Sequence, residues 1–101
     1  GPQQELLPGM VISNEPGYYQ ENCFGIRCEN LIVVRECDND MLSFETITFA
    51  PFDTRLVDTS LMTPEEITWL NDYHDEVSAK LGPMLNEDDL DWLENATRTV
   101  V

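Results

Sequence analysis

Two glutamates, Glu15 and Glu29, flank a polar turn at residues 20–23 and are the residues of this sequence best placed for chemistry. If the segments on either side pair as an antiparallel hairpin centred on Asn22, the two glutamates face each other. Directly opposed side chains have Cβ atoms roughly 4.5–5.5 Å apart on one face of a sheet. Carboxylates held that close repel each other unless they share a proton or bind cations between their oxygens. Hard divalent cations prefer carboxylate oxygens, and a pair of such ions can share one carboxylate as a bridge.

A second interpretation of the same spacing requires no metal. Glu15 would point to solvent at the end of a strand, and Glu29 would form an ion pair with Arg27 or another base. Pro16 weakens regular pairing beside Glu15, and a β-bulge would shift the register by one residue. Spacing alone favours this second interpretation.

The elements that must position the glutamates are strands in the first half of the chain. Short runs of β-branched and aromatic residues, separated by turn residues, predict them. We expect one strand within residues 7–13, a long one over 24–34 and a third over 41–49, which Pro51 stops. Residues 35–40 are predicted to form a polar hairpin or loop.

Helices are predicted after residue 58, where the apolar period changes from two to about three and a half. Thr63, Pro64 and Glu66 supply an N-cap, a first-turn proline and a capping-box acid. Gly82-Pro83 should end this first helix. Its buried stripe should consist of Leu70, Tyr73, Val77 and Leu81.

A second helix should begin at Asn86 and bury Leu90 and Leu93, with Trp92 and Ala96 as further candidates. The acidic residues after Asn86 suit the positive end of the helix dipole. The sequence therefore predicts an α+β chain with strands first and helices last. We expect its parts to be residues 1–58 and 59–101.

Composition limits the partners of the chain. Its 101 residues suffice for one small domain, and 20 acidic against 5 basic residues give a net charge of −15. This charge argues against nucleic acid and anionic membranes, which both attract basic surfaces. We also find neither the run of about 18 apolar residues that a membrane span requires nor a signal peptide. The missing methionine at position 1 agrees with a chain cut from something longer, and Gly1-Pro2 is either a protease scar or native sequence.

The three cysteines are odd in number and lack a CxxC spacing, so reduced thiols in a cytoplasmic protein are expected. Cys28 alternates with charged residues in a predicted strand, and we expect it to be small and buried. His74 lies on the first predicted helix, where a packing or surface role is favoured over catalysis. Glu45 is expected to make structural hydrogen bonds, and Trp69 to pack against its neighbours, like Trp92.

Two motifs beside the turn resemble those of a known family. They are Asn14-Glu15-Pro16-Gly17-Tyr18-Tyr19 and Phe24-Gly25-Ile26-Arg27-Cys28-Glu29-Asn30. Both are similar to the glutamate motifs of the aminopeptidase P family, "pita-bread" metallopeptidases related to prolidase, creatinase and methionine aminopeptidase. Residues 7–10, 42–48 and 63–74 also resemble this family, the last two its long type with an extra C-terminal region. The resemblance extends from about residue 7 to residue 93.

The resemblance implies a role for each matching residue. Glu15 would ligate one metal and accept a proton from the attacking water, and Glu29 would bridge two metals. Arg27 and Tyr19 match positions that hydrogen-bond around the metal carboxylates. Cys28 departs from the family pattern, which usually has an aliphatic residue there. The other metal ligands, two aspartates and one histidine, and the catalytic histidines belong to motifs upstream of Gly1.

The implied parent enzyme removes the first residue from peptides with proline second, using two divalent metals, manganese by family preference. The fold would be the C-terminal half of a pita-bread domain, its antiparallel strands followed by two helices. This chain alone should be inactive, because two ligands cannot hold a productive dinuclear site. Strand surfaces that normally face the missing half would be exposed, so we expect them to be covered by a homodimer or by partner chains.

Two rival functions remain open at this stage. A prolidase-type dipeptidase has the same metal ligands, and residues 44–74 speak against it. A non-catalytic pita-bread binding module is the rival from another class. Retention of both Glu15 and Glu29 speaks against that module, although the upstream ligands would decide.

Overall fold

The computed structural model describes residues 3–101, so Gly1-Pro2 lie outside the described part. The chain divides into two compact units, Gly1–Thr48 and Phe49–Val101. The first contains all the described strands, and the second contains both described α-helices. The α+β prediction, with strands before helices, is therefore confirmed. The division after residue 58 remains a prediction about domains.

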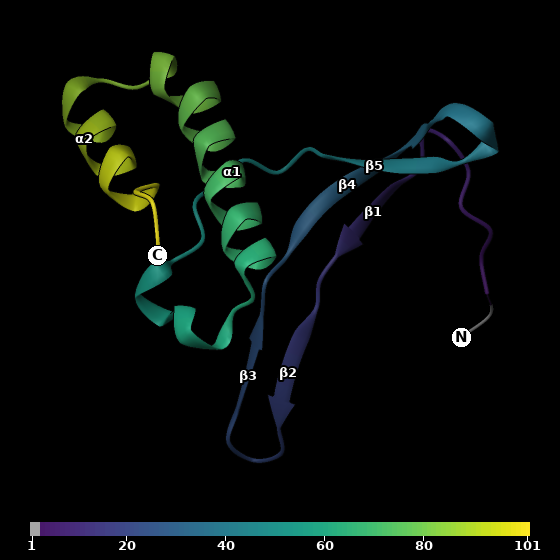
Figure 1. Cartoon of the computed structure of the whole chain (residues 1–101), viewed down its shortest axis with the longest axis horizontal. Coiled ribbons are helices and arrows are strands. Elements are labelled where there is room, and N and C mark those ends of the chain that lie inside the picture. Colours follow the sequence, from purple (N-terminus) through teal and green to yellow (C-terminus); the bar gives the residue numbers. More distant parts are fainter. Residues whose placement is uncertain (1–2) are drawn as a thin grey trace. The chain divides into compact units, whose positions relative to one another are not determined.

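The first unit is built from antiparallel strands (Figure 1). Three of them form a sheet in the order β1-β4-β5: β1 (Val11–Asn14), β4 (Asn30–Glu36) and β5 (Leu42–Thr46). The other two, β2 (Gly17–Gln20) and β3 (Phe24–Arg27), form a hairpin. In Figure 1, β1 leads into β2 and β3 leads into β4, so both strand pairs belong to one long ribbon.

The single strand predicted over residues 24–34 is interrupted between Arg27 and Asn30. The N–H of Cys28 donates to the carbonyl of Pro16 at 3.1 Å. Pro16 has no N–H to return that bond, so the ladder loses one rung there. The strand assignment stops while the backbone stays paired.

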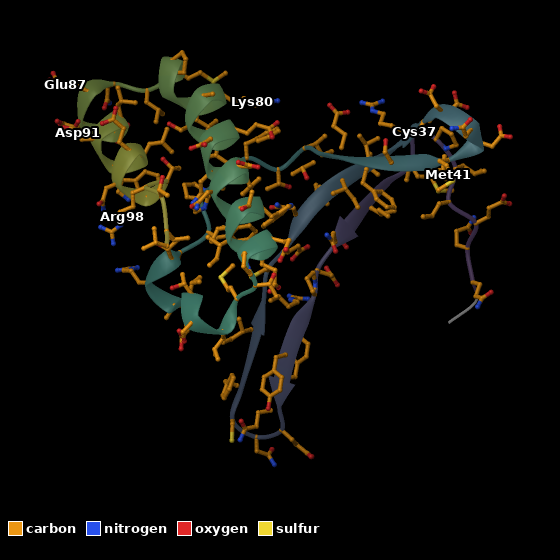
Figure 2. All side chains as sticks on the ribbon, in the orientation of Figure 1. Cys37, Met41, Lys80, Glu87, Asp91 and Arg98 are labelled. Carbon is orange, nitrogen blue, oxygen red and sulfur yellow. The ribbon has the colours of Figure 1, made fainter. Side chains whose placement is uncertain are left out.

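Cys28 itself is exposed, so its predicted burial is wrong. Every residue of β2 and β3 is exposed as well, because no described element covers this hairpin. The buried part of the sheet is its central strand, where Ile32, Val33 and Val34 are at most 8% exposed. At the far end of β4 the chain turns through Asp38–Asp40, with the Cys37 N–H donating to the Met41 carbonyl at 2.9 Å (Figure 2).

Helix α1 (Pro64–Leu81) begins at the predicted capping box. The Thr63 N–H donates to Glu66 Oε1 at 2.8 Å, and the Glu66 N–H donates to Thr63 Oγ1 at 3.2 Å. The hydrogen bond from the Thr63 N–H lowers the pKa of the Glu66 carboxyl. Such a cap stabilises a helix by about 1 kcal/mol.

Helix α1 ends at Leu81, and Gly82–Met84 continue as a 3-10 turn, in agreement with the predicted stop. Helix α2 (Glu87–Ala96) follows, and its predicted cap is confirmed by a 2.8 Å bond from the Asp89 N–H to Asn86 Oδ1. The described residues include no helix with the length and apolar character needed to cross a membrane.

The core of the second unit joins both helices to the segment before them. Tyr73 and Val77 of α1 and Leu93 of α2 are buried together. Four partly buried residues complete this cluster: Phe49, Phe52, Leu81 and Leu85. Trp92 does not take part and is 62% exposed, so its predicted burial is wrong. It lies one position before Leu93, and neighbouring helix positions point about 100° apart.

Candidate metal centre

Glu15 and Glu29 lie opposite each other in an unbroken register. On one side Gly17 pairs with Arg27, and on the other side Asn14 pairs with Asn30. Both pairs are equally distant from Asn22, so no bulge shifts the residues between them. The register predicted from the sequence is confirmed, and Asn22 occupies the left-handed conformation at the turn with φ 59°.

The side chain next to Glu15 is that of Arg27. Arg27 Nη1 lies 3.9 Å from Glu15 Oε1, and both side chains are about half exposed. An exposed ion pair at this separation contributes roughly 0–1 kcal/mol to stability. It therefore favours one orientation of the Glu15 carboxylate but does not hold the group rigidly. Glu29 forms no ion pair within residues 3–101. The interpretation that paired Arg27 with Glu29 is therefore not what the structure shows.

Tyr19 lies on the same face of the hairpin and packs over two glycines. A Cβ atom on Gly25, its cross-strand partner, would lie 2.6 Å from Tyr19 Cδ1. A Cβ atom on Gly17 would lie 2.9 Å from Tyr19 Oη and 2.8 Å from Arg27 Cγ. The two glycines thus leave the space that the Tyr19 ring and the Arg27 stem occupy. This role of the two glycines was not predicted from the sequence, although glycine inside a strand is itself a signal of close approach.

The two carboxylates fit a site for hard divalent cations, since both are exposed acids facing each other across one strand pair. They do not complete one. Within residues 3–101 there is no cluster of three or more histidine, cysteine, aspartate or glutamate side chains that could hold a metal. Two carboxylates would leave most coordination positions of a dinuclear centre open, so such a centre would need further ligands.

The other titratable candidates have structural partners. His74 is fully buried, and its Nε2 accepts a hydrogen bond from the Phe52 N–H at 3.0 Å, which confirms a packing role. Burial lowers the pKa of this imidazole. Glu45 accepts a 2.7 Å hydrogen bond from Arg35 Nε across the β4–β5 pair, as predicted. Trp69 stacks on Tyr73 with ring centroids 5.6 Å apart, so its packing role is confirmed.

Comparisons with known proteins agree with this geometry. A family model described as metallopeptidase family M24 matches residues 1–36. A second, described as the C-terminal region of peptidase M24, matches residues 40–100. The chain belongs to metallopeptidase family M24.

Individual relatives narrow the resemblance to one branch. The chain is 43% identical over 104 residues to a probable Xaa-Pro aminopeptidase P of Coprinopsis cinerea, covering 94% of this chain and 17% of the relative. It is 44% identical over 106 residues to aminopeptidase P2 of Arabidopsis thaliana, covering 97% of this chain and 15% of the relative. These relatives are aminopeptidases P, and the chain spans about a sixth of their length.

A solved structure shows the same arrangement of elements. The X-prolyl aminopeptidase of Caenorhabditis elegans, described as a cytosolic enzyme with a di-nuclear active site, matches with a TM-score of 0.80 and 36% identity. The match covers 93% of this chain and 17% of that protein. The strands and two helices described here are therefore a part of the pita-bread aminopeptidase P fold.

Proposed function

We propose that this chain is the C-terminal part of a metal-dependent Xaa-Pro aminopeptidase, which releases the first residue from peptides with proline second. One observation carries the proposal: Glu15 and Glu29 stand opposite each other in an unbroken register within the M24 motifs. The names of the relatives and of the solved structure support the substrate class.

Two divalent cations, when bound, supply Lewis-acid activation of water and of the scissile carbonyl. In our proposal Glu15 would be a ligand of one cation, and Glu29 would be a ligand shared by both. Glu15 would also accept a proton from the attacking water, because a carboxylate beside the bound cations is a suitable general base. We propose that both cations are manganese.

Arg27 and Tyr19 position these carboxylates. The Arg27 guanidinium lies beside Glu15, and its stem is held over Gly17 in the space that a side chain would otherwise fill. Tyr19 Oη reaches the same glycine from within β2, the strand to which both residues belong. Both groups therefore border the face on which we place the metals, and both can donate hydrogen bonds to the ligands.

We further propose that the enzyme is cytoplasmic and forms a homodimer. The description of the C. elegans relative as cytosolic supports the first point. Large exposed apolar side chains on the hairpin and the sheet favour burial against other protein surface. They include Tyr18, Phe24, Ile26 and Phe44, which are between 51% and 62% exposed. Nucleic acid and membranes are not proposed as partners.

The test is an assay of the longer polypeptide that contains this chain, with manganese and an Arg-Pro-Pro peptide. We expect release of the first residue, and a loss of at least about 100-fold in kcat/KM in the Glu29→Gln variant. Glu36→Gln, an exposed change at the end of β4, is the matched control and should keep the activity. Full activity of Glu29→Gln would refute the proposed site. Turnover by the 101-residue chain alone would contradict our proposal that these residues hold only part of the active site.

Substrate length separates this proposal from a prolidase. An aminopeptidase P should cleave the tripeptide and longer peptides, whereas a prolidase should prefer Xaa-Pro dipeptides. Cleavage of dipeptides alone would show that the protein is a prolidase and not an aminopeptidase P. Absence of turnover with all of these peptides, together with absence of bound metal, would favour the non-catalytic binding module.

A further inference from the structure

A pocket of about 330 Å³ lies in the second unit. All of its lining residues follow residue 48 in the sequence, so none belongs to the strands around Glu15 and Glu29. We call it the connector pocket. One wall comes from residues 51–55, which precede α1 and include the start of the 3-10 turn Thr54–Leu56, and the other comes from α2 and the residues just after it. The lining residues that matter here are Phe52, Asp53, Arg55, Trp92 and Arg98.

Arg98 gives this pocket an uncompensated positive charge. Four of the five basic residues of the chain form ion pairs with a carboxylate, and among residues 3–101 Arg98 is the exception. Its one described side-chain contact is a long 3.4 Å bond from Nη1 to Asn95 Oδ1. Figure 2 shows Arg98 just past the last turn of α2, with its nitrogen atoms extending away from the helix. A basic side chain without an acid partner is unusual in this chain, because acidic residues outnumber basic ones by 20 to 5.

Arg55 adds donors without adding much net charge. Its Nε and Nη2 donate to Asp53 Oδ1 and Oδ2 at 2.9 and 2.7 Å, so the two side chains form a bidentate pair. The hydrogen bonds from Arg55 lower the pKa of Asp53 to about 2, and its carboxyl stays ionised at neutral pH. The remaining N–H groups of Arg55 have no acceptor among the described residues. The charged groups of the pocket are thus the Arg98 guanidinium, which has no acid partner, and the Asp53–Arg55 pair, whose charges cancel.

Two aromatic side chains, Phe52 and Trp92, also line the pocket. Trp92 is 62% exposed and makes no ring contact within the described residues. Phe52 lines the opposite wall and is only partly buried by the core. An exposed indole costs free energy in water, and it is a common anchor where a partner binds. The connector pocket therefore places the guanidinium group of Arg98 and the apolar ring of Trp92 in one lining.

We propose that the connector pocket binds the C-terminal carboxylate of a short peptide whose last side chain is apolar or aromatic. A guanidinium fork matches a carboxylate in two parallel hydrogen bonds, and the side chain would lie against Trp92. The volume is at the low end of small-molecule pockets, so it accommodates a terminal residue and not a long segment.

A phosphate is a poorer match for the same groups. A dianion would enter a strongly acidic chain against more repulsion than a single carboxylate. Asp91 and Glu94 stand on α2 itself, and Asp53 lines the pocket. A ligand with one negative charge and an apolar body gains the attraction of Arg98 with the least repulsion from these acids.

The test uses the intrinsic fluorescence of Trp92. In a Trp69→Phe background Trp92 is the one remaining indole, and Phe keeps a ring against Tyr73. We would titrate N-acetylphenylalanine, its amide N-acetylphenylalaninamide, and inorganic phosphate into the 101-residue chain. We expect a saturable change with the acid, and binding at least roughly tenfold weaker with the uncharged amide and with phosphate.

Variants assign the effect to Arg98. Arg98→Gln should weaken binding of the acid by roughly tenfold or more, and Arg98→Lys should recover part of it. Lys80→Gln removes the same charge elsewhere and should bind as the parent does. Circular dichroism and urea unfolding check that each variant is folded. Equal binding of acid and amide, tighter binding of phosphate, no saturable change, or an unaffected Arg98→Gln protein would each overturn the proposal. If Arg98→Gln fails to fold, the acid-to-amide comparison in the parent decides.

Discussion

Arg27 Nη1 lies 3.9 Å from Glu15 Oε1, and Arg27 belongs to the strand that leads directly to Glu29. The Arg27 guanidinium thus lies beside Glu15, the first proposed metal ligand, and Arg27 precedes Glu29, the second, by two residues in the sequence. Two opposing effects follow from this position. The positive charge repels a metal, and the hydrogen-bonding group orients the ligand. Because both side chains are half exposed, the Coulomb effect is screened and orientation should dominate.

Replacing Arg27 therefore tests its role as a positioning residue. In the longer polypeptide, Arg27→Met should weaken manganese binding by roughly 10-fold or more. Arg35→Met removes an equal charge from β4 and should leave manganese affinity unchanged. Isothermal titration of the metal into both variants measures this. Tighter binding in Arg27→Met would show that repulsion, not orientation, is the main effect.

The glycines under Tyr19 give a second prediction. Gly25→Ala places a methyl group 2.6 Å from Tyr19 Cδ1, so the ring must move. Such overpacking costs about 1–3 kcal/mol in the free energy of unfolding, less where the exposed ring can shift. Gly82→Ala is the matched control, because its Cβ would meet Leu90 Cδ1 at an ordinary 3.5 Å in a helical backbone. Urea unfolding should place Gly25→Ala below the parent and Gly82→Ala at or above it; the reverse order would contradict the packing described here.

The buried imidazole of His74 makes stability depend on pH. Its Nε2 accepts the Phe52 N–H, so the ring proton sits on Nδ1, which has no partner among the described residues. Burial lowers the pKa of the folded-state imidazole below the 6.5 of the unfolded chain. The unfolded state then binds more protons, so stability is full above pH 6.5 and falls as the pH decreases toward the folded-state pKa.

The matched variant is His74→Gln, which keeps an acceptor for Phe52 and does not titrate. Between pH 7 and 5.5 the parent should lose stability relative to this variant, with a slope of up to about 1.4 kcal/mol per pH unit. Urea unfolding at several pH values measures the difference, and carboxylates common to both proteins cancel. Parallel stability curves for the two proteins would exclude a lowered pKa.

Asn71 fastens the end of the chain to α1. Its Nδ2 donates to the Val100 carbonyl and its Oδ1 accepts from the Val100 N–H, both at 2.9 Å. Asn71→Ala should cost about 1–3 kcal/mol, because both bonds are lost at a partly buried site. Asn71→Asp keeps the acceptor and should cost less. Amide exchange at Val100 should accelerate more in the alanine variant than in the aspartate variant; unchanged exchange in both would contradict this attachment.

The predictable parts of this fold are those that local chemistry determines. Thr63 with Glu66, and Asn86 with the acids that follow it, specify both helix starts from a few neighbouring side chains. The hairpin register follows from the turn at Asn22 and held on both sides of the glutamates.

The unpredicted parts depend on what surrounds each element. Trp92 and Cys28 carry apolar side chains and looked buried, yet nothing in the described chain covers them. The break between Arg27 and Asn30 arises from one bond that Pro16, on the other strand, cannot return. The space over Gly17 and Gly25 becomes visible only when Tyr19 is placed across the hairpin.

The most direct test of the proposed centre is the metal content of the longer polypeptide, purified with manganese and measured by plasma mass spectrometry. The parent and the Glu36→Gln control should each hold two manganese ions per chain. We predict that Glu15→Gln retains one or fewer, and that Glu29→Gln, lacking the shared ligand, retains almost none. Two manganese ions in folded Glu29→Gln would contradict the assignment of Glu29 as the bridge.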